Sequence, residues 1–173
     1  MSNSFGILYL CVHNAGRSQM AAALTRSMAN ANVVVLSGGS APANSVNPMA
    51  LAAMDELGIS LADEQPKKWT MEMLHEVDVV ISMGCGDDCP ILPGKERLDW
   101  EITDPAGQDL DFVRRVRDEI QLREVIDSPA QLCPQLISIR RGQFAINTGV
   151  FAQRSEPLNQ ISSSLCVHMG IKL

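Results

Sequence analysis

A cysteine and an arginine lie six positions apart, at Cys11 and Arg17, with five small or polar residues between them. An apolar run over residues 5–10 precedes this stretch, and an alanine-rich, helix-forming run begins near Ser18. Where a strand passes through a tight loop into a helix, the backbone N–H groups and the free amides of the helix N-terminus converge on one point. Arg17 adds a planar fork that can bind two oxygens at once. The stretch therefore predicts a pocket for an oxyanion.

The thiol of Cys11 is expected at the floor of this pocket. Helix N-termini and nearby cations favour the ionised form of a thiol, so we expect a thiolate at neutral pH, with the Ser18 hydroxyl as a further hydrogen-bond donor. A cysteine six residues before an arginine also arises by chance, and a lone cysteine at a strand end is usually a small buried hydrophobe. The apolar run before the loop, the helix after it and the small residues inside it favour the functional interpretation.

Residues 11–20, C-V-H-N-A-G-R-S-Q-M, resemble the phosphate-binding loop of the low-molecular-weight tyrosine phosphatase fold, and most closely its arsenate reductase branch. Further motifs of that family follow in order at residues 37–40 (SGGS), 46–48 (VNP), 83–90 (MGCGDDCP), 98–100 (LDW), 103–107 (TDPAG) and 116–120 (VRDEI). Several motifs in the right order, spread over residues 5–126, are far more specific than one.

Composition indicates one globular domain. The 173 residues, 46% of them hydrophobic and 4% aromatic, suffice for a single core. A net charge of −6 argues against broad binding to nucleic acid or anionic membranes, which both need a basic surface. No apolar stretch approaches the roughly 20 residues that span a bilayer, and the first residues lack a signal-peptide pattern. We therefore expect a cytoplasmic protein in which any pairing among the five cysteines is catalytic or transient.

Alternating strand and helix patterns predict an α/β fold with a four-stranded parallel sheet flanked by helices, as in the low-molecular-weight phosphatases. Strands are expected at residues 5–10, 33–36, 77–82 and 98–101. Helices are expected at residues 19–29, 48–57, 71–75 and 111–126, with Thr70 capping the third and Gly58 closing the second. Ligands of such sheets bind at the carboxyl ends of the strands, where the Cys11 loop lies.

The segments between these elements carry further expectations. One face of the second helix is expected in the core, with Met49, Ala50, Ala53, Met54 and Leu57. Residues 59–68 are predicted to be an irregular connector. Residues 83–97, with their glycines and prolines, are predicted to be a mobile loop with at most one helical turn.

The resemblance implies how arsenate would be bound and attacked. Its oxygens would accept hydrogen bonds from Arg17 and from the backbone amides of the loop, which consists of Val12, His13, Asn14, Ala15 and Gly16. Cys11 would attack arsenic from the floor. Asp104, followed by a proline, matches the general acid of the family and would give a proton to the leaving hydroxide. Without the other motifs, an aspartate before proline would be read as an ordinary turn residue.

The resemblance to the thioredoxin-coupled branch also implies roles for Cys85 and Cys89. Cys85 would attack Cys11 so that arsenite leaves, and Cys89 would then attack Cys85, which leaves a Cys85–Cys89 disulfide for thioredoxin to reduce. The interval between the two cysteines is shorter than in the best-known members of that branch, although a three-residue separation can still close a disulfide. Actinobacterial-type sequences of the form G-C-G-D-x-C-P are nearer, and some of those use mycothiol. The external reductant is therefore thioredoxin or mycothiol with mycoredoxin, and no bound cofactor is expected.

No metal site is expected. A structural zinc site needs four ligands, commonly as two close pairs, whereas Cys85 and Cys89 are one pair and the three histidines, His13, His75 and His168, are scattered.

Some relatives hold a potassium ion behind the loop through an asparagine, a serine and two carboxylates. Asn14 and Ser37 match that set, but the carboxylate positions align with Ala22 and Lys67. A lysine ammonium is expected to replace the charge of the ion, so we expect no potassium requirement.

A protein tyrosine phosphatase of the same fold is the main alternative, because the loop, Arg17 and Asp104 would serve phosphoryl transfer equally well. Ala106 and Gly107 argue against it, since the phosphatases carry aromatic side chains there to enclose a phenol ring. Paired cysteines also have no use in hydrolysis. A third reading, from another class, is a protein that only binds oxyanions or senses oxidants through Cys11, which modification without turnover would support.

The sequence is divided at the end of the last predicted helix. The resemblance implies an arsenate reductase-like domain over residues 1–126, and residues 127–173, an unassigned C-terminal extension, resemble nothing in the family. Residues 136–139 and 143–146 are compatible with a hairpin around Arg141 and Gly142, and the serines at 162–164 with a linker. Cys133 and Cys166 receive no role. A genuine appendage, a dimer contact and an out-of-frame sequence all stay open for this tail.

Overall fold

The computed structural model describes residues 4–29, 31–84 and 93–127. Within these ranges the chain forms, in order, β1 Phe5–Cys11, α1 Arg17–Met28, β2 Val33–Gly39, α2 Pro48–Asp55, α3 Met71–Glu76, β3 Val79–Ser82, β4 Glu96–Asp99 and α4 Leu110–Asp127. The strands pair in the order β2-β1-β3-β4, and every pair is parallel. The predicted parallel sheet of four strands is confirmed.

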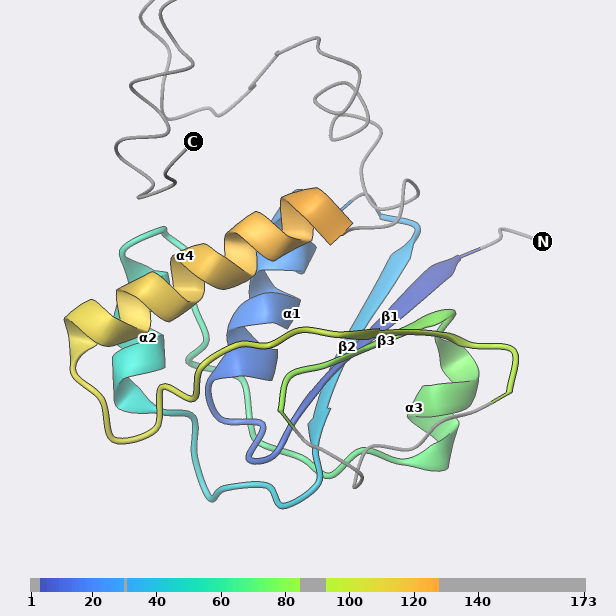
Figure 1. Cartoon of the computed structure of the whole chain (residues 1–173), viewed down its shortest axis with the longest axis horizontal. Coiled ribbons are helices and arrows are strands. Elements are labelled where there is room, and N and C mark those ends of the chain that lie inside the picture. Colours follow the sequence, from blue (N-terminus) through green and yellow to red (C-terminus); the bar gives the residue numbers. More distant parts are fainter. Residues whose placement is uncertain (1–3, 30, 85–92, 128–173) are drawn as a thin grey trace, which may run out of the picture.

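Helices cover both faces of the sheet, which explains the unbroken apolar run of β1. Successive strand residues point to opposite faces. Ile7 and Tyr9 therefore join one core with α1, α2 and α4, whereas Leu8 and Leu10 join a second core with Leu74 of α3. Figure 1 shows α1, α2 and α4 gathered on one side of the sheet and α3 alone on the other.

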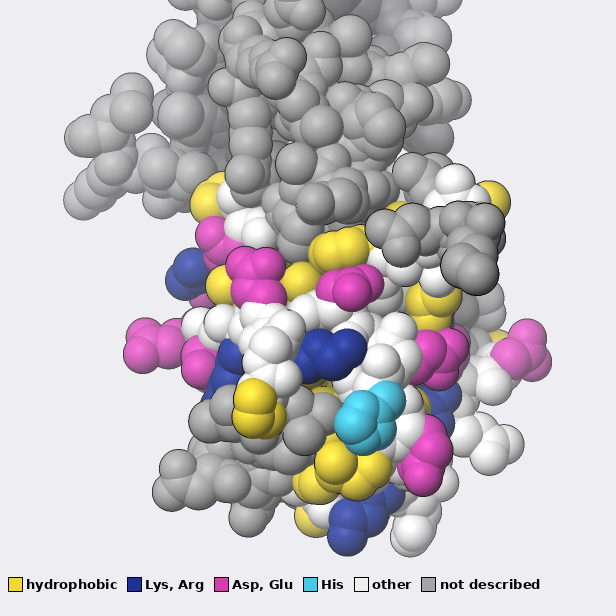
Figure 2. All heavy atoms as spheres, turned by 90° about the vertical axis from the view of Figure 1, so that its right-hand side faces the viewer, with side chains coloured by type: hydrophobic (Ala, Val, Ile, Leu, Met, Phe, Trp, Pro, Cys, Tyr) yellow, Lys and Arg dark blue, Asp and Glu magenta, His cyan; other side chains and the backbone are white. Residues whose placement is uncertain are grey.

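The side of the molecule that carries α3 has a mixed surface. In Figure 2, acidic, basic and apolar side chains are interspersed over the described part of this face. In the described ranges, no helix has the length and apolar character needed to cross a membrane.

β2 extends three residues beyond its predicted end, and this extension supports the Cys11 loop. Residues 37–39 stay paired with residues 9–11 of β1. Gly39 is required there by close approach, because a Cβ at this position would lie 2.6 Å from the Val12 carbonyl oxygen and 2.9 Å from the Asn14 nitrogen. The loop after β1 therefore packs directly on the backbone at the end of β2.

The third and fourth strands differ from the prediction. β3 begins two residues later than predicted. Val77, before it, is buried in the second core, and the Asp78 carboxylate accepts a hydrogen bond from the Gly6 N–H (2.8 Å). The fourth strand, predicted at residues 98–101, lies two residues earlier. β4 pairs residue by residue with β3, and the chain turns after Trp100, whose carbonyl accepts from the Ile102 N–H (3.0 Å).

The end of α2 explains a second error. Gly58 closes the helix as predicted: its φ is +72°, its N–H donates to the Asp55 carbonyl, and the Ile59 N–H donates to the Met54 carbonyl. This pattern is a Schellman motif. Leu57 lies past the last helical turn and is 43% exposed, so its predicted place in the core is wrong, and Ile59 packs against the core instead.

The other helices lie within two residues of their predicted bounds, and the Thr70 hydroxyl caps α3 by accepting from the Met73 N–H (3.3 Å). Most of the predicted mobile loop, residues 85–92, lies outside the described residues. The same is true of residues 128–173, with the predicted hairpin, the serine-rich linker and both tail cysteines.

A buried polar cluster joins β1 to the two helices that cover it. The Tyr9 hydroxyl donates to a Glu124 carboxylate oxygen (2.7 Å) and lies 2.8 Å from the Thr25 hydroxyl, and all three side chains are almost fully buried. Burial, followed by the negative charge of Glu124, raises the pKa of Tyr9 well above its ordinary value.

The raised pKa of Tyr9 predicts a loss of stability in alkali. Above about pH 10, unfolded chains release the tyrosine proton while folded chains keep it, so the free energy of unfolding falls as the pH rises, by up to about 1.4 kcal/mol per pH unit. Tyr9 is the single tyrosine of the chain. Ultraviolet absorbance of tyrosinate should therefore appear only as the protein unfolds. Tyr9→Phe should abolish the signal and flatten this pH dependence. Tyrosinate formation at an ordinary pH in folded protein would contradict the prediction.

Candidate active site

Cys11 is the last residue of β1, and its thiol is 2% exposed at the base of the loop that leads into α1. Two groups of the nucleophile loop, defined here as residues 11–18, contact its sulfur. The Asn14 N–H donates to Sγ (3.2 Å), and the Ser18 hydroxyl lies 3.0 Å from Sγ. These two contacts fix the position of the sulfur at the base of the loop.

The carbonyl groups of the nucleophile loop are bonded on its outer side. Those of Cys11, Val12, His13 and Ala15 accept from the N–H groups of residues 40, 41, 43 and 47, at 2.8–3.3 Å. In a planar trans peptide the C=O and the following N–H point in opposite directions. The following N–H groups are therefore directed inward, as the Asn14 N–H to the sulfur shows. The loop presents donors to the space above Cys11, as an oxyanion site requires.

Arg17 opens α1 and turns its guanidinium to the other side of the same space. Nη1 donates to the Ile102 carbonyl (3.1 Å), and Nη2 donates to the Asp104 carboxylate (2.9 Å). The Arg17 side chain is 7% exposed, whereas that of Asp104 is 46% exposed. Gly16, the residue before the helix, has no side chain that could cap the N-terminus of α1. The positive end of the helix dipole lies at this N-terminus, beside the loop.

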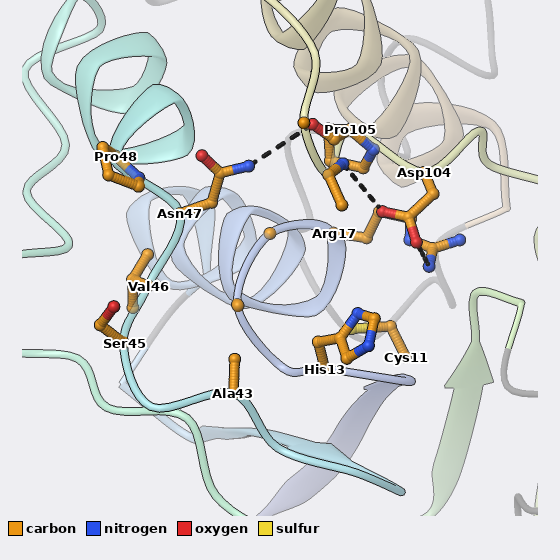
Figure 3. Close-up of a pocket in the computed structure, with 14 residues that line it drawn as sticks. Cys11, His13, Arg17, Ala43, Ser45, Val46, Asn47, Pro48, Asp104 and Pro105 are labelled. Atoms are coloured by element: carbon orange, nitrogen blue, oxygen red, sulfur yellow. Dashed lines mark hydrogen bonds and ion pairs between the residues drawn. The ribbon is translucent and has the colours of Figure 1, made fainter.

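Cys11, Arg17 and Asp104 line one cavity of about 390 Å³. Figure 3 shows Cys11 and His13 at its floor, Arg17, Asp104 and Pro105 on one side, and Ala43 with residues 45–48 on the other. The remaining lining residues include Ala15, Gly16, Ala106 and Gly107. Asn47 links the two sides, since its amide caps α2 at the Met49 N–H (2.9 Å) and donates to the Pro105 carbonyl (3.5 Å).

Asn14 sets the shape of the loop. Among the described non-glycine residues it alone has a positive φ, of 47°, a conformation that asparagine tolerates better than most residues. It is fully buried. Its side-chain oxygen accepts from the Lys67 backbone N–H (2.9 Å) and from the Gln19 amide (3.3 Å), and its side-chain nitrogen donates to the Ser18 hydroxyl (2.8 Å).

Lys67 meets this cluster through its backbone rather than through an ammonium group, and its side chain is on the exposed surface. The role expected for the Lys67 charge is therefore wrong. Ala22 is buried in the first core. Sequence reasoning missed Gln19, whose fully buried amide on α1 contacts Asn14 and the Gln65 carbonyl (3.3 Å each).

Potassium is expected to have no specific effect on activity. The oxygen of Asn14 already accepts two N–H donors, which occupy both of its lone pairs. Steady-state rates in potassium and sodium salts of equal ionic strength should agree within about twofold. A marked rise in potassium alone would contradict this expectation.

Cys85 and Cys89 lie outside the described residues. The chain reaches them through Gly84, which has a φ of +74° and packs against Arg17, since a Cβ there would lie 2.8 Å from Nη1. The structure thus brings together Cys11, the loop amides, Ser18, Arg17 and Asp104, and it places the entry to the Cys85 segment beside the guanidinium.

Comparisons with known proteins agree on one family. Residues 6–132 match the family described as low molecular weight phosphotyrosine protein phosphatase. A Bacillus cereus protein named arsenate reductase 1 is 39% identical over 127 residues, which cover 71% of this chain and 93% of the relative.

Two solved structures carry the same fold. One is a Corynebacterium glutamicum thioredoxin-dependent arsenate reductase, with a TM-score of 0.62 and 42% identity, over 72% of this chain and 61% of that one. This chain thus spans less than two thirds of that solved protein. The other, an arsenate reductase from Archaeoglobus fulgidus, has a TM-score of 0.57 and 31% identity, over 68% of this chain and 94% of its own.

Proposed function

The chain belongs to the low molecular weight phosphotyrosine protein phosphatase family, and on that premise we propose that it is an arsenate reductase. The observation that carries the proposal is a single cavity with the Cys11 sulfur at its floor, Arg17 in its wall and Asp104 at its rim. Relatives and structural neighbours named arsenate reductase support the choice of substrate. We place the catalytic unit within residues 1–126, in the cytoplasm, and assign no function to residues 127–173.

In the first step, the loop amides and Arg17 bind the oxygens of arsenate. Arg17 has five N–H donors in a fixed fork, and it exchanges its bond with Asp104 for bonds with the anion. Cys11 then attacks arsenic, an As–S bond forms, and an As–O bond breaks. Asp104, released from Arg17, takes up a proton from solvent and passes it to the departing oxygen, which leaves as water.

In the second step, Cys85 attacks the sulfur of Cys11, and the electron pair of the S–As bond passes to arsenic. Arsenate(V) thereby becomes arsenite(III), which leaves, and a Cys11–Cys85 disulfide remains. Cys89 attacks Cys85 and releases the Cys11 thiolate. The position of Gly84 against Arg17 supports this order, because the chain enters the Cys85 segment beside the anion site. An external thiol reductant then supplies two electrons and two protons to the Cys85–Cys89 disulfide.

Thioredoxin is the proposed reductant, since the Corynebacterium glutamicum neighbour is named thioredoxin-dependent, and mycothiol with mycoredoxin is the alternative. The test is arsenite production by the whole chain in parallel assays with each system. Hydrolysis of an aryl phosphate is measured beside it. Arsenite production with either reductant supports the proposal. Phosphate release without arsenite production would overturn it in favour of a phosphatase, and modification of Cys11 without turnover would favour a sensor.

Asp104→Asn is expected to lower kcat for arsenate about a hundredfold and to tighten binding of phosphate, a competing oxyanion, by roughly tenfold. Asp104 holds Arg17 in the free site as the carboxylate and donates the proton as the carboxylic acid, so its replacement slows the reaction while it releases the guanidinium for the anion. Steady-state arsenate reduction gives kcat, and its inhibition by added phosphate gives the affinity for phosphate. Asp111→Asn, an exposed change of equal charge on α4 beside Arg114, is the control. An unchanged kcat would contradict the role of Asp104.

A further inference from the structure

Four polar side chains lie fully buried behind the nucleophile loop, on the side away from the cavity floor: Asn14, Ser18, Gln19 and Ser37. They come from the loop, from α1 and from β2, and hydrogen bonds join them to the backbone of residues 65–67. Such a network fixes the orientation of each of its members when every group has a partner.

The directions of these bonds follow from groups that can only donate or only accept. The Lys67 N–H can only donate, so the atom of Asn14 that faces it (2.9 Å) is the side-chain oxygen. The side-chain nitrogen of Asn14 must then face Ser18 (2.8 Å), and the Ser18 oxygen accepts from it. The hydrogen of the Ser18 hydroxyl is left for Cys11 Sγ, at 3.0 Å.

Gln19 is oriented in the same way. The Gln65 carbonyl can only accept, so the group that faces it (3.3 Å) is the Gln19 side-chain nitrogen, which also reaches the Asn14 oxygen (3.3 Å). The Gln19 oxygen is then directed to the Ser37 hydroxyl, at 3.5 Å. Gln19 thus ties the oxygen of Asn14 to the segment that carries Gln65 and to β2.

The segment that receives Gln19 is itself fixed to the sheet. The Gly39 N–H donates to the Lys67 carbonyl (2.9 Å), and the Trp69 N–H donates to the Gly39 carbonyl (3.2 Å). The buried side chains of Ser37, Gln19, Asn14 and Ser18 are called the relay below. The relay is anchored at the end of β2, on which the nucleophile loop also packs.

We propose that Gln19 is a positioning residue for the nucleophile, which acts on Cys11 through Asn14 and Ser18. With the Gln19 amide in place, Asn14 keeps its left-handed conformation and presents its nitrogen to Ser18, so that Ser18 donates to the sulfur. Without it, one of the two donors that hold the Asn14 oxygen is lost, and the hydroxyl of Ser18 is free to turn away. The effect on arsenate turnover rests on the proposed function, whereas the effect on the thiol does not.

The test uses Gln19→Met, which keeps the length of the side chain and removes its hydrogen bonds, in the full chain. Peptide-resolved alkylation of Cys11 by iodoacetamide is measured against pH, together with kcat and KM for arsenate. Thr25→Val is the matched control, because it removes a buried hydroxyl from the same helix, where that hydroxyl contacts Tyr9. Ser37→Ala is a smaller change at the far end of the relay and serves if Gln19→Met does not fold.

Gln19→Met is expected to slow Cys11 alkylation at neutral pH about fivefold and to lower kcat about tenfold with little change in KM. Ser37→Ala should slow alkylation and lower kcat by about twofold each. Thr25→Val should lower only thermal stability. An alkylation profile and kcat that stay unchanged in folded Gln19→Met, or in Ser37→Ala if that variant alone folds, would overturn the proposal. Slowed alkylation in a protein that never reduces arsenate would uphold the relay and reject the proposed substrate.

Discussion

Cys11→Ser should abolish arsenate reduction, with a loss of at least about a thousandfold, and should leave oxyanion binding nearly intact. Serine fits the buried position, its oxygen can accept the Asn14 N–H in place of the sulfur, and Arg17 is held by Ile102 and Asp104 rather than by Cys11. A hydroxyl, however, is a weak nucleophile at neutral pH and cannot form a disulfide with a second cysteine. The variant therefore binds the substrate but has neither the attacking atom nor a route for the electrons.

The measurement is arsenite formation by steady-state assay, together with calorimetric titration of phosphate into the same preparation. Cys133→Ser, the same change at a cysteine with no assigned role, is the matched control and should keep full activity. Arsenite formation by Cys11→Ser within tenfold of the unaltered protein would show that another residue starts the reaction.

Arg17→Lys is expected to reduce kcat/KM for arsenate by about 10²–10³-fold, which corresponds to about 3–4 kcal/mol of transition-state stabilisation. Lysine keeps the charge, but its ammonium is a point charge that cannot present two parallel N–H groups to two oxygens. The Arg17 side chain is almost fully buried and is held at both ends of its fork, by Ile102 and Asp104, so its geometry is fixed before the anion arrives.

The expected loss is divided between binding and chemistry, so kcat should fall and KM should rise. Phosphate should also inhibit the variant more weakly. Arg114→Lys is the matched control, because Arg114 forms exposed ion pairs with Glu56 and Asp111 away from the cavity. Full activity in Arg17→Lys would mean that a charge alone suffices and that the planar fork has no catalytic value.

The nucleophile loop could be predicted from the sequence because the residues that form it are neighbours along the chain. Cys11, the small residues after it and Arg17 are consecutive, and the apolar run and the helix that flank them fix the geometry in between. The parallel sheet was also predictable, because strand and helix patterns alternate along the chain and β1 is apolar on both of its faces.

The parts that sequence reasoning missed depend on contacts between distant backbones. Lys67 supports Asn14 with its N–H, a group that every residue except proline carries, so the side chain gave no signal and its charge misled. Gln19 reads as an ordinary helix former until the Gln65 carbonyl is placed beside it. The position of β4 likewise depends on its register with β3, and side-chain type does not encode that register.

The most direct test of the central claim is a single-turnover experiment. Fully reduced protein is mixed with arsenate and no other reductant, and released arsenite and remaining free thiols are counted per chain. We expect one arsenite and the loss of two thiols, with the disulfide mapped to Cys85 and Cys89. An arsenic adduct on Cys11 without arsenite would contradict the internal cascade, and it would mean that an external thiol completes the reduction.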